Sequence, residues 1–192
     1  FTVFAITTVL PLALLAGALL VRSANSERAL LEGSLVQVAN SLANDIDREL
    51  DRDFTVLRTL ARLPSLTSQD WSAFYEQAKS AVEGKGYVIL IDTSLRQLVN
   101  TRVPYGSAPA LTRDPQTAHL ILHSKQPAVS NLFFSLIDKV PVFNVNIPIL
   151  RDGEVQFILI YGHQADDLLP ILIGQHLTAE WVTTIVDRNR IL

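Results

Sequence analysis

The stretch VPVFNVNIPILRDGEVQFILIYG, residues 140–162, decides the fold class of this chain. Two runs rich in apolar and β-branched residues, Val140–Leu150 and Val155–Gly162, flank the sequence Arg151-Asp152-Gly153. Asp-Gly between two such runs is a strong short-range signal for a β-hairpin, because both residues tolerate the backbone angles of a tight turn. The stretch therefore predicts two antiparallel strands joined by a short turn.

The same criteria predict the other elements on either side of this hairpin. Helices are expected from Trp71 to Gly84, from Asp114-Pro115 to His123, and over Asp166–His176. A final strand is expected over Trp181–Asp187. Together with the hairpin, three more runs give an α+β fold on one antiparallel five-stranded sheet flanked by helices; these runs are Tyr87–Asp92, Arg96–Thr101 and Val129–Ile137.

A long helix is expected ahead of the sheet, from Ser26 to Leu63, where Pro64 ends it. Apolar residues recur there at steps of three and four, which is the spacing of one helix face; they are Leu35, Ala39, Leu42, Ile46, Leu50, Phe54, Leu57 and Leu60. Charged residues are expected on the other faces, among them Glu49, Arg52 and Asp53. The apolar stripe is explained either by a homodimeric coiled coil or by packing on the helix's own domain.

The segment Phe1–Val21 carries no charge and is long enough to cross the hydrocarbon core of a bilayer as a helix. A signal peptide is the main alternative, because Ala16-Gly17-Ala18 gives an A-x-A pattern, but the apolar run continues through Val21. A buried core helix is the second alternative. We expect a retained membrane helix, with the residues after Arg22 exported. No methionine occurs anywhere, so we expect a part of a longer protein.

Composition excludes several function classes. The net charge is −3 and the 16 Lys and Arg residues are scattered, so no nucleic-acid partner is expected. The absence of cysteine excludes disulfides and thiolate chemistry. No catalytic motif is present and no cofactor is expected. The sequence also lacks the nucleophile–base pairing that a hydrolase needs, so a hydrolase is not expected. His119 and His123 have metal-ligand spacing on a helix, but no third ligand lies beside them in the sequence, so we expect no metal site.

The order of elements and several local sequences resemble the PAS-like extracellular sensor domains called Cache domains, in their double-Cache arrangement. Tyr87–Asp92 followed by Leu98–Arg102 is similar to the first hairpin of such domains in sensor histidine kinases. The hairpin over residues 142–161 is similar to their central hairpin. Residues 185–191 resemble the opening of the second subdomain, with Arg190 where glycine is usual.

The resemblance implies a domain plan and a function. It implies a transmembrane helix over residues 1–21, a stalk helix over 22–64, a membrane-distal sensor domain over 65–178, and the start of a membrane-proximal subdomain over 179–192. The function implied is an extracytoplasmic ligand-sensing input domain in the bacterial inner membrane, with a sensor histidine kinase following Leu192. A chemoreceptor, a diguanylate cyclase, or an anchored exported protein-interaction module without a small ligand are the alternatives.

In Cache domains the ligand pocket lies between the sheet and the loops and helix that follow the first hairpin. This implies five candidate ligand-binding residues: Arg102, Tyr105, Asn131, Asn144 and Tyr161. Arg102 is suited to grip a carboxylate with two hydrogen bonds, so an amino acid or organic acid is the expected ligand. The alternative interpretations put Arg102 on the surface, Asn144 on an exposed sheet edge and Tyr161 in the core.

Overall fold

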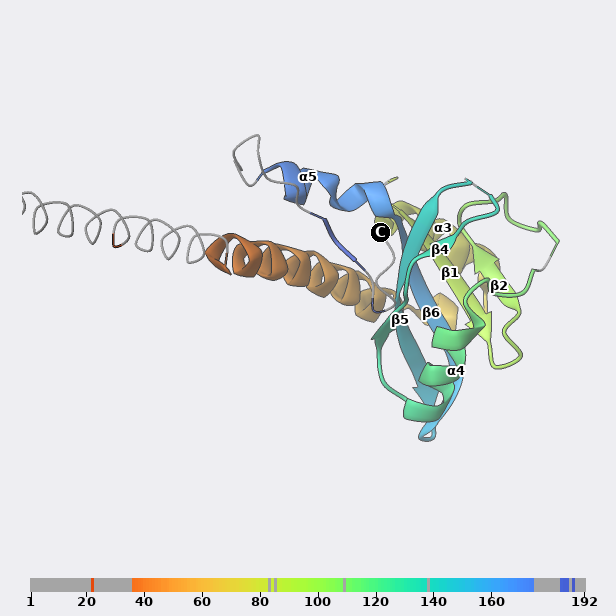
Figure 1. The fold of residues 1–192 in the computed structure, drawn as a ribbon. Helices are drawn as coiled ribbons and strands as arrows, with labels where there is room; N and C mark the ends of the chain where they lie inside the picture. The colour runs from red at the N-terminus through yellow and green to blue at the C-terminus, as the bar shows by residue number, and fades with distance from the viewer. Residues whose placement is uncertain are drawn as a thin grey trace, which may run out of the picture. The chain divides into compact units, whose positions relative to one another are not determined.

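The computed structural model describes residues 22, 36–82, 84, 86–108, 110–137, 139–174, 184–186 and 188. The chain divides into two compact units, Phe1–Asn44 and Asp45–Leu192, and the sheet belongs to the second (Figure 1). The segment Phe1–Val21 lies outside the described residues. Of the helices that are described, none combines the length and the apolar character needed to cross a membrane.

The predicted long helix is present over residues 36–60 and ends just before Leu63-Pro64, and its predicted residues 26–35 lie outside the described residues. Within the second unit, Leu50, Phe54, Leu57 and Leu60 of this helix pack against the core on one face of the sheet. This part of the apolar stripe therefore docks the helix on its own domain, and dimerisation through the stalk stays a prediction. The expectation that Asp53 lies on a solvated face is wrong, because its exposed fraction is only 4%.

Within the described residues, six strands form the sheet, where five were predicted. They are β1 (Tyr87–Asp92), β2 (Gln97–Asn100), β3 (Ala128–Val129), β4 (Phe133–Phe134), β5 (Pro141–Arg151) and β6 (Glu154–Gln164). The strand order is β2-β1-β6-β5-β3, with β4 also paired to β5, and every pairing is antiparallel. β1 has the predicted bounds, and the predicted hairpin of β5 and β6 is confirmed.

The predicted strand Val129–Ile137 is two strands because the chain bulges at Ser130. Ala128 pairs with Asn146 and Phe133 with Val142, so five residue steps on this side face four on β5. At the break, the backbone N–H of Ser130 donates to the carbonyl of Asn144 at 2.8 Å, and the Ser130 hydroxyl accepts from the Asn144 N–H at 2.8 Å. A side-chain oxygen thus takes the place of a ladder carbonyl, which is how a bulge keeps buried backbone groups paired.

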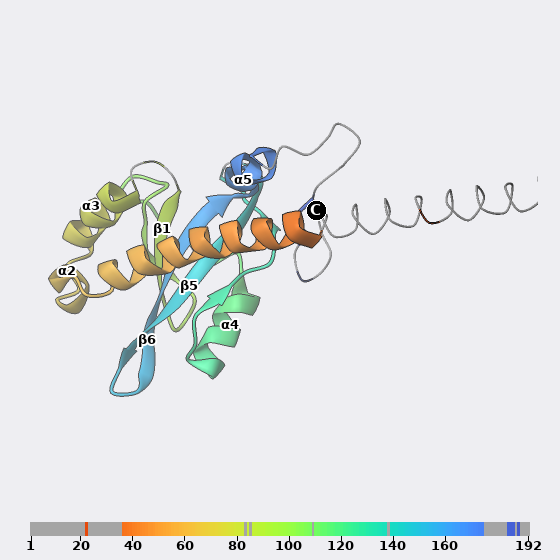
Figure 2. The ribbon, with the colours of Figure 1, turned by 90° about the vertical axis from the view of Figure 1, so that its left-hand side faces the viewer.

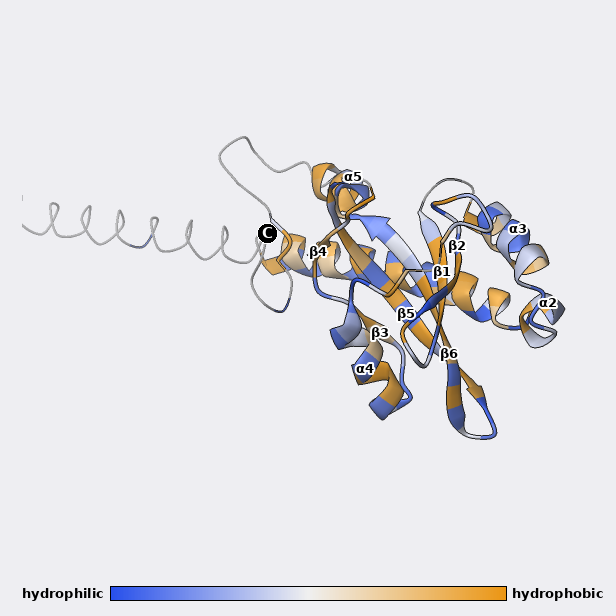
Figure 3. Cartoon of the chain, turned by 90° about the vertical axis from the view of Figure 1, so that its right-hand side faces the viewer, coloured by the Kyte–Doolittle hydropathy of each residue, from blue (hydrophilic) through white to orange (hydrophobic). Residues whose placement is uncertain are grey.

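Helices cover both faces of the sheet. Residues 45–60 of the long helix cross over β5 and β6 (Figure 2), and α3 (Trp71–Val82) packs on the same face against β1 and β2. The opposite face, viewed in Figure 3, carries α4 (Pro115–Ser124). There Ala118 and Ile121 pack with Ile89, Ile91 and the isoleucines of β6. Asp114 caps α4 as predicted, since its carboxylate accepts the Thr117 N–H at 3.1 Å.

The remaining helices are short. α2 (Pro64–Thr67) follows the long helix, and η1 (Ala165–Leu168) and α5 (Leu169–Ile173) follow β6. Where a single helix is predicted over Asp166–His176, the described residues form a 3-10 turn followed by one helical turn with Pro170 at its start, and residues 175–176 lie outside the described residues. Of the predicted strand Trp181–Asp187, residues 184–186 have no regular structure and the others lie outside the described residues.

Candidate functional site

A cavity of about 220 Å³ opens on the sheet face that carries α4. It lies between the start of β1, the segment after β2, and the turn between β4 and β5. Its wall is largely apolar, from side chains that include Ile89, Leu111, Phe133, Leu136 and Ile137. A few polar groups converge within it, chiefly Tyr87, Asn100, Arg102, Ser135 and Asn144. An apolar wall with few polar groups is the usual composition of a small-molecule site.

Arg102 is held in place on this wall by two kinds of contact. Its Nη2 donates a hydrogen bond to the Ser135 hydroxyl at 2.6 Å. Its guanidinium carbon lies 4.1 Å from the centre of the Tyr87 ring, within the range of a cation–π contact. Burial lowers the pKa of Arg102 and the neighbouring Tyr87 raises it, but an arginine side chain remains charged at neutral pH. The cavity therefore contains a fixed positive charge.

Tyr87 reaches its position because the residue opposite it on β6 is a glycine. Tyr87 pairs with Gly162, and Gly162 pairs with Asn144 on β5, so the three lie in one row across the sheet. A Cβ on Gly162 would lie 2.1 Å from Cζ of Tyr87, so only glycine lets the ring lie across β6. The Tyr87 hydroxyl then donates to Asn144 Oδ1 at 3.3 Å. Burial raises the pKa of Tyr87, partly offset by Arg102, so the phenol stays protonated.

Asn144 is buried, with an exposed fraction of 3%, and its backbone is paired with Ser130. The alternative interpretation that Asn144 lies on an exposed edge is therefore wrong, because β5 lies between β6 and β3. The bulge at Ser130 and the glycine at position 162 together determine where the Asn144 amide and the Tyr87 phenol meet.

The structure brings two of the five candidate residues, Arg102 and Asn144, to this cavity. Tyr105 is half exposed, packs at 5.5 Å against the Tyr75 ring, and lines a separate shallow hollow. Asn131 lies between β3 and β4, where its carbonyl accepts the Ser130 hydroxyl at 2.8 Å. Tyr161 belongs to the core on the opposite sheet face. Whether any of the five binds a ligand stays a prediction.

Sequence reasoning missed Tyr87, Asn100 and Ser135. Tyr87 was assigned only to a strand, and Ser135 lay within a predicted continuous strand. A tyrosine facing a glycine with an asparagine beyond it is a usable signal, but reading it requires the register of three strands.

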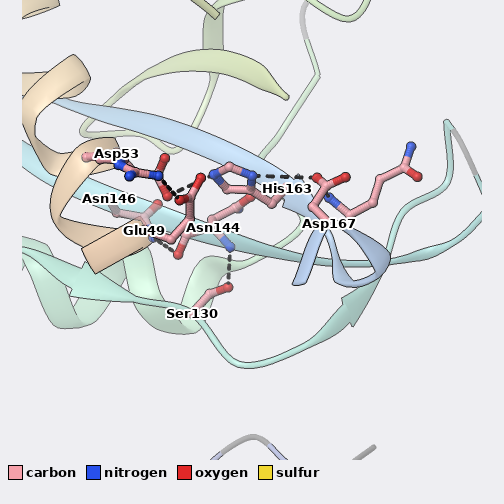
Figure 4. A network of polar contacts seen from close by, with 9 residues as sticks. Glu49, Asp53, Ser130, Asn144, Asn146, His163 and Asp167 are labelled. Carbon is pink, nitrogen blue, oxygen red and sulfur yellow. Dashed lines mark hydrogen bonds and ion pairs between the residues drawn. The ribbon is translucent and has the colours of Figure 1, made fainter. Parts of the chain in front are cut away.

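A second polar cluster, which sequence reasoning also missed, lies on the opposite sheet face (Figure 4). His163 of β6 points its Nε2 at Asp53 Oδ2 of the long helix, at 2.9 Å. Its Nδ1 lies 3.5 Å from Asp167 Oδ2 of η1. The side chains of His163 and Asp53 are 7% and 5% exposed, so this is a buried pair. An imidazolium donates to both carboxylates, whereas a neutral imidazole donates to one.

The predicted histidine pair of α4 lies at the surface. His119 and His123 are exposed, and His123 Nδ1 lies 2.8 Å from the carbonyl oxygen of His119. Within the described part of the chain, no three histidine, aspartate or glutamate side chains are grouped so as to hold a metal ion.

No protein-family model and no curated protein sequence matches this chain. Its fold is similar to solved sensor domains. The ligand-binding domain of the amino-acid chemoreceptor PctC from Pseudomonas aeruginosa PAO1, in complex with GABA, has a TM-score of 0.53 at 14% identity, over 71% of this chain and 63% of that one. The sensor domain of the histidine kinase DctB from V. cholerae has a TM-score of 0.56 at 10% identity, over 77% and 58%.

An extracellular ligand-binding receptor from Desulfohalobium retbaense is also similar, with a TM-score of 0.54 at 14% identity, over 73% of this chain and 26% of that one. The chain thus spans less than two thirds of each of these three structures. At such identities the likeness concerns the fold. In that fold, this chain is similar to the Cache-type extracellular sensor domains of chemoreceptors and of a sensor histidine kinase.

Proposed function

We propose that this chain is the extracytoplasmic ligand-binding input domain of a bacterial transmembrane signalling receptor, and that it binds a small carboxylate beside Arg102. The observation that carries the proposal is the fixed guanidinium of Arg102 in an otherwise largely apolar cavity. A guanidinium recognises a carboxylate with paired, charge-assisted hydrogen bonds. Asn144 and Tyr87 supply further polar groups in the same cavity.

The size of the cavity limits the ligand. A volume of 220 Å³ equals that of about seven molecules of liquid water at about 30 Å³ each. It is also below the range of about 300–1,000 Å³ typical of sites for drug-sized ligands. We therefore propose an amino acid or a short organic acid. The PctC structure, which contains GABA, supports this size class for the fold.

Thermal unfolding of the chain with single carboxylates, each in large excess, tests the proposal. A ligand at about 100 times its Kd stabilises the folded state by about 2.7 kcal/mol, which raises Tm by roughly 5–11 °C for a chain of this size. Butyrate and GABA form a matched pair, because they differ by one ammonium group. Comparing them determines whether the site also requires a cation on the ligand.

Arg102→Gln is the variant that tests the site. Loss of charge-assisted hydrogen bonds worth about 1.5–3 kcal/mol weakens binding by roughly 10- to 150-fold. Arg151→Gln, at the exposed end of β5, is the control and retains wild-type affinity. Failure of every carboxylate to raise Tm, or equal binding by Arg102→Gln and the wild type, would refute the proposal.

The receptor around this domain is also part of the proposal. We infer that Phe1–Val21 spans the inner membrane, that two copies associate through the stalk helix, and that residues 179–192 begin the second subdomain of a double-Cache arrangement. The output we favour is a histidine kinase, with a chemoreceptor or a diguanylate cyclase as alternatives. Similarity to both DctB and PctC supports a receptor without separating these outputs. Autophosphorylation by the full-length receptor separates them.

A protein-interaction module without a small ligand is the second candidate function. The observation that favours it is a group of exposed apolar side chains around the turn between β4 and β5, where Phe134, Leu136 and Ile137 are 50–61% exposed. Phe134→Ser would abolish partner binding under this candidate and leave carboxylate binding unchanged, because Phe134 is exposed and is not among the residues that line the cavity. Loss of carboxylate binding in Phe134→Ser would contradict this separation.

A further inference from the structure

Two neighbouring residues of β6, Gly162 and His163, contact opposite faces of the sheet. Successive residues of a strand alternate between faces. Gly162 lies under the Tyr87 ring, on the face of the ligand cavity. His163 lies on the other face, stacked at 5.2 Å on Phe143, its cross-strand partner on β5. One peptide unit therefore joins the residue under Tyr87, whose side chain lines the cavity, to the face on which the long helix is docked.

His163 lies among several carboxylates on that face. Asp53 and Glu49 come from the long helix and Asp167 comes from η1 (Figure 4). Burial, and then the charges of Asp53, Glu49 and Asp167, raise the pKa of the neighbouring Tyr161 to about 12. A buried carboxylate left without its partner is strongly unfavourable. The docking of the long helix on β6 at Asp53 therefore depends on the position of His163.

Asp167 also lies near residues that line the ligand cavity. It lines a hollow of about 390 Å³ whose other walls include Tyr87, Thr101 and Arg102. Tyr87 and Arg102 line the ligand cavity as well. Tyr87 and Arg102 therefore share the wall of one hollow with Asp167, and Tyr87 also packs on Gly162, the residue before His163.

We infer that the Gly162–His163 step of β6 couples occupancy of the ligand cavity to the position of the helix over residues 45–60, through Tyr87 on one face and the Asp53–His163–Asp167 bridge on the other. This coupling rests on the proposed function, because it describes how that site is read out. A ligand shifts the helix only as far as it binds one arrangement more tightly than the other. His163 is a positioning residue in this coupling, because it lies on the sheet face opposite the cavity and acts on the helix through Asp53.

The test needs no ligand, so it is independent of whether the cavity binds a carboxylate. The chain has no cysteine, so Asp47→Cys and Arg151→Cys provide two unique, exposed spin-label sites, one on the long helix and one at the end of β5. Pulsed electron paramagnetic resonance on the whole labelled chain in detergent micelles measures the distance between them. Gly162→Ala displaces the Tyr87 ring and imitates a change in the cavity.

We expect Gly162→Ala to move the label distance by about 1–2 Å, the scale of helix shifts in switching proteins. In a His163→Gln background, Gly162→Ala does not shift the label distance, because the contact between His163 and Asp53 is already lost. Tyr87→Leu removes the ring instead of displacing it and provides the same comparison if Gly162→Ala does not fold. The control is Glu154→Gln, which breaks an exposed ion pair with Lys125 and leaves the distance unchanged.

An unchanged distance in both cavity variants, or an equal shift with and without His163, overturns the coupling. If no carboxylate binds but the label distance shifts in a His163-dependent way, the proposed ligand class is refuted and the coupling through Gly162 and His163 is supported. If a carboxylate binds in an Arg102-dependent way but the label distance shows no His163-dependent shift, the ligand site is supported and the coupling is refuted.

Discussion

Removing the carboxylate of Asp53 tests the claim that a buried hydrogen-bonded pair, Asp53 and His163, docks the long helix on the sheet. Asp53→Ala deletes a charge-assisted hydrogen bond of 2.9 Å to His163, within a pair whose side chains are 5% and 7% exposed. Such a bond contributes about 1.5–3 kcal/mol. His163 keeps Asp167 as a partner at 3.5 Å. We therefore expect a loss of about 2–3 kcal/mol in the free energy of unfolding.

Removing the histidine of the pair has a larger effect than removing the carboxylate. His163→Leu leaves Asp53 buried and without its hydrogen-bond partner, and breaking a buried pair in this way costs about 3–5 kcal/mol. In the double variant neither group is left buried without its partner, so the loss in the free energy of unfolding is expected to be smaller than the sum of the two single losses by about 2 kcal/mol.

Urea unfolding followed by circular dichroism measures all three variants at pH 7. Asp51→Ala is the matched control, because it makes the same substitution at an exposed position of the same helix and changes stability by no more than about 0.5 kcal/mol. Equal losses for Asp53→Ala and Asp51→Ala, or single losses that add up in the double variant, would refute the docking role of the pair.

Two further substitutions test the elements that shape the site. Burial raises the pKa of Asp92, but hydrogen bonds from Ser94 and the Arg96 backbone together outweigh it, so the pKa is lowered. A lowered folded-state pKa gives stability that is present above the unfolded pKa and lost as pH falls through the folded value, so Asp92→Asn should lower Tm at pH 7 and match the wild type near pH 2. A loss equal at both pH values would contradict this. Ser130→Ala leaves the Asn144 N–H without its acceptor and should cost about 1–3 kcal/mol in urea unfolding; no loss relative to the exposed Ser72→Ala would show that the bulge does not need the hydroxyl.

Local patterns were sufficient for the central hairpin, for β1 and for the end of the long helix. Asp152 and Gly153 specify a turn through their own backbone preferences, and the alternation of side chains along β5 follows from strand geometry alone. Pro64 disfavours helical geometry in the residue before it. These effects act within a few residues, which is why the sequence predicts them without knowledge of the rest of the chain.

Contacts distant in sequence decided the remaining features. The strand predicted over Val129–Ile137 breaks because the Ser130 hydroxyl meets Asn144, 14 residues away. Asp53 looks like any charge on a solvated helix until His163, 110 residues later, is placed beside it.

By itself the sequence determined an α+β chain with a long helix ahead of an antiparallel sheet, and it marked Arg102 and Asn144 among its candidate residues. Only the tertiary structure decided which polar residues share a cavity. It placed Tyr87 beside Arg102 and turned Tyr161 to the opposite face. The physical reason is strand register: a shift of one residue exchanges the two faces of a sheet, and register is determined by pairing between strands that are far apart in the chain.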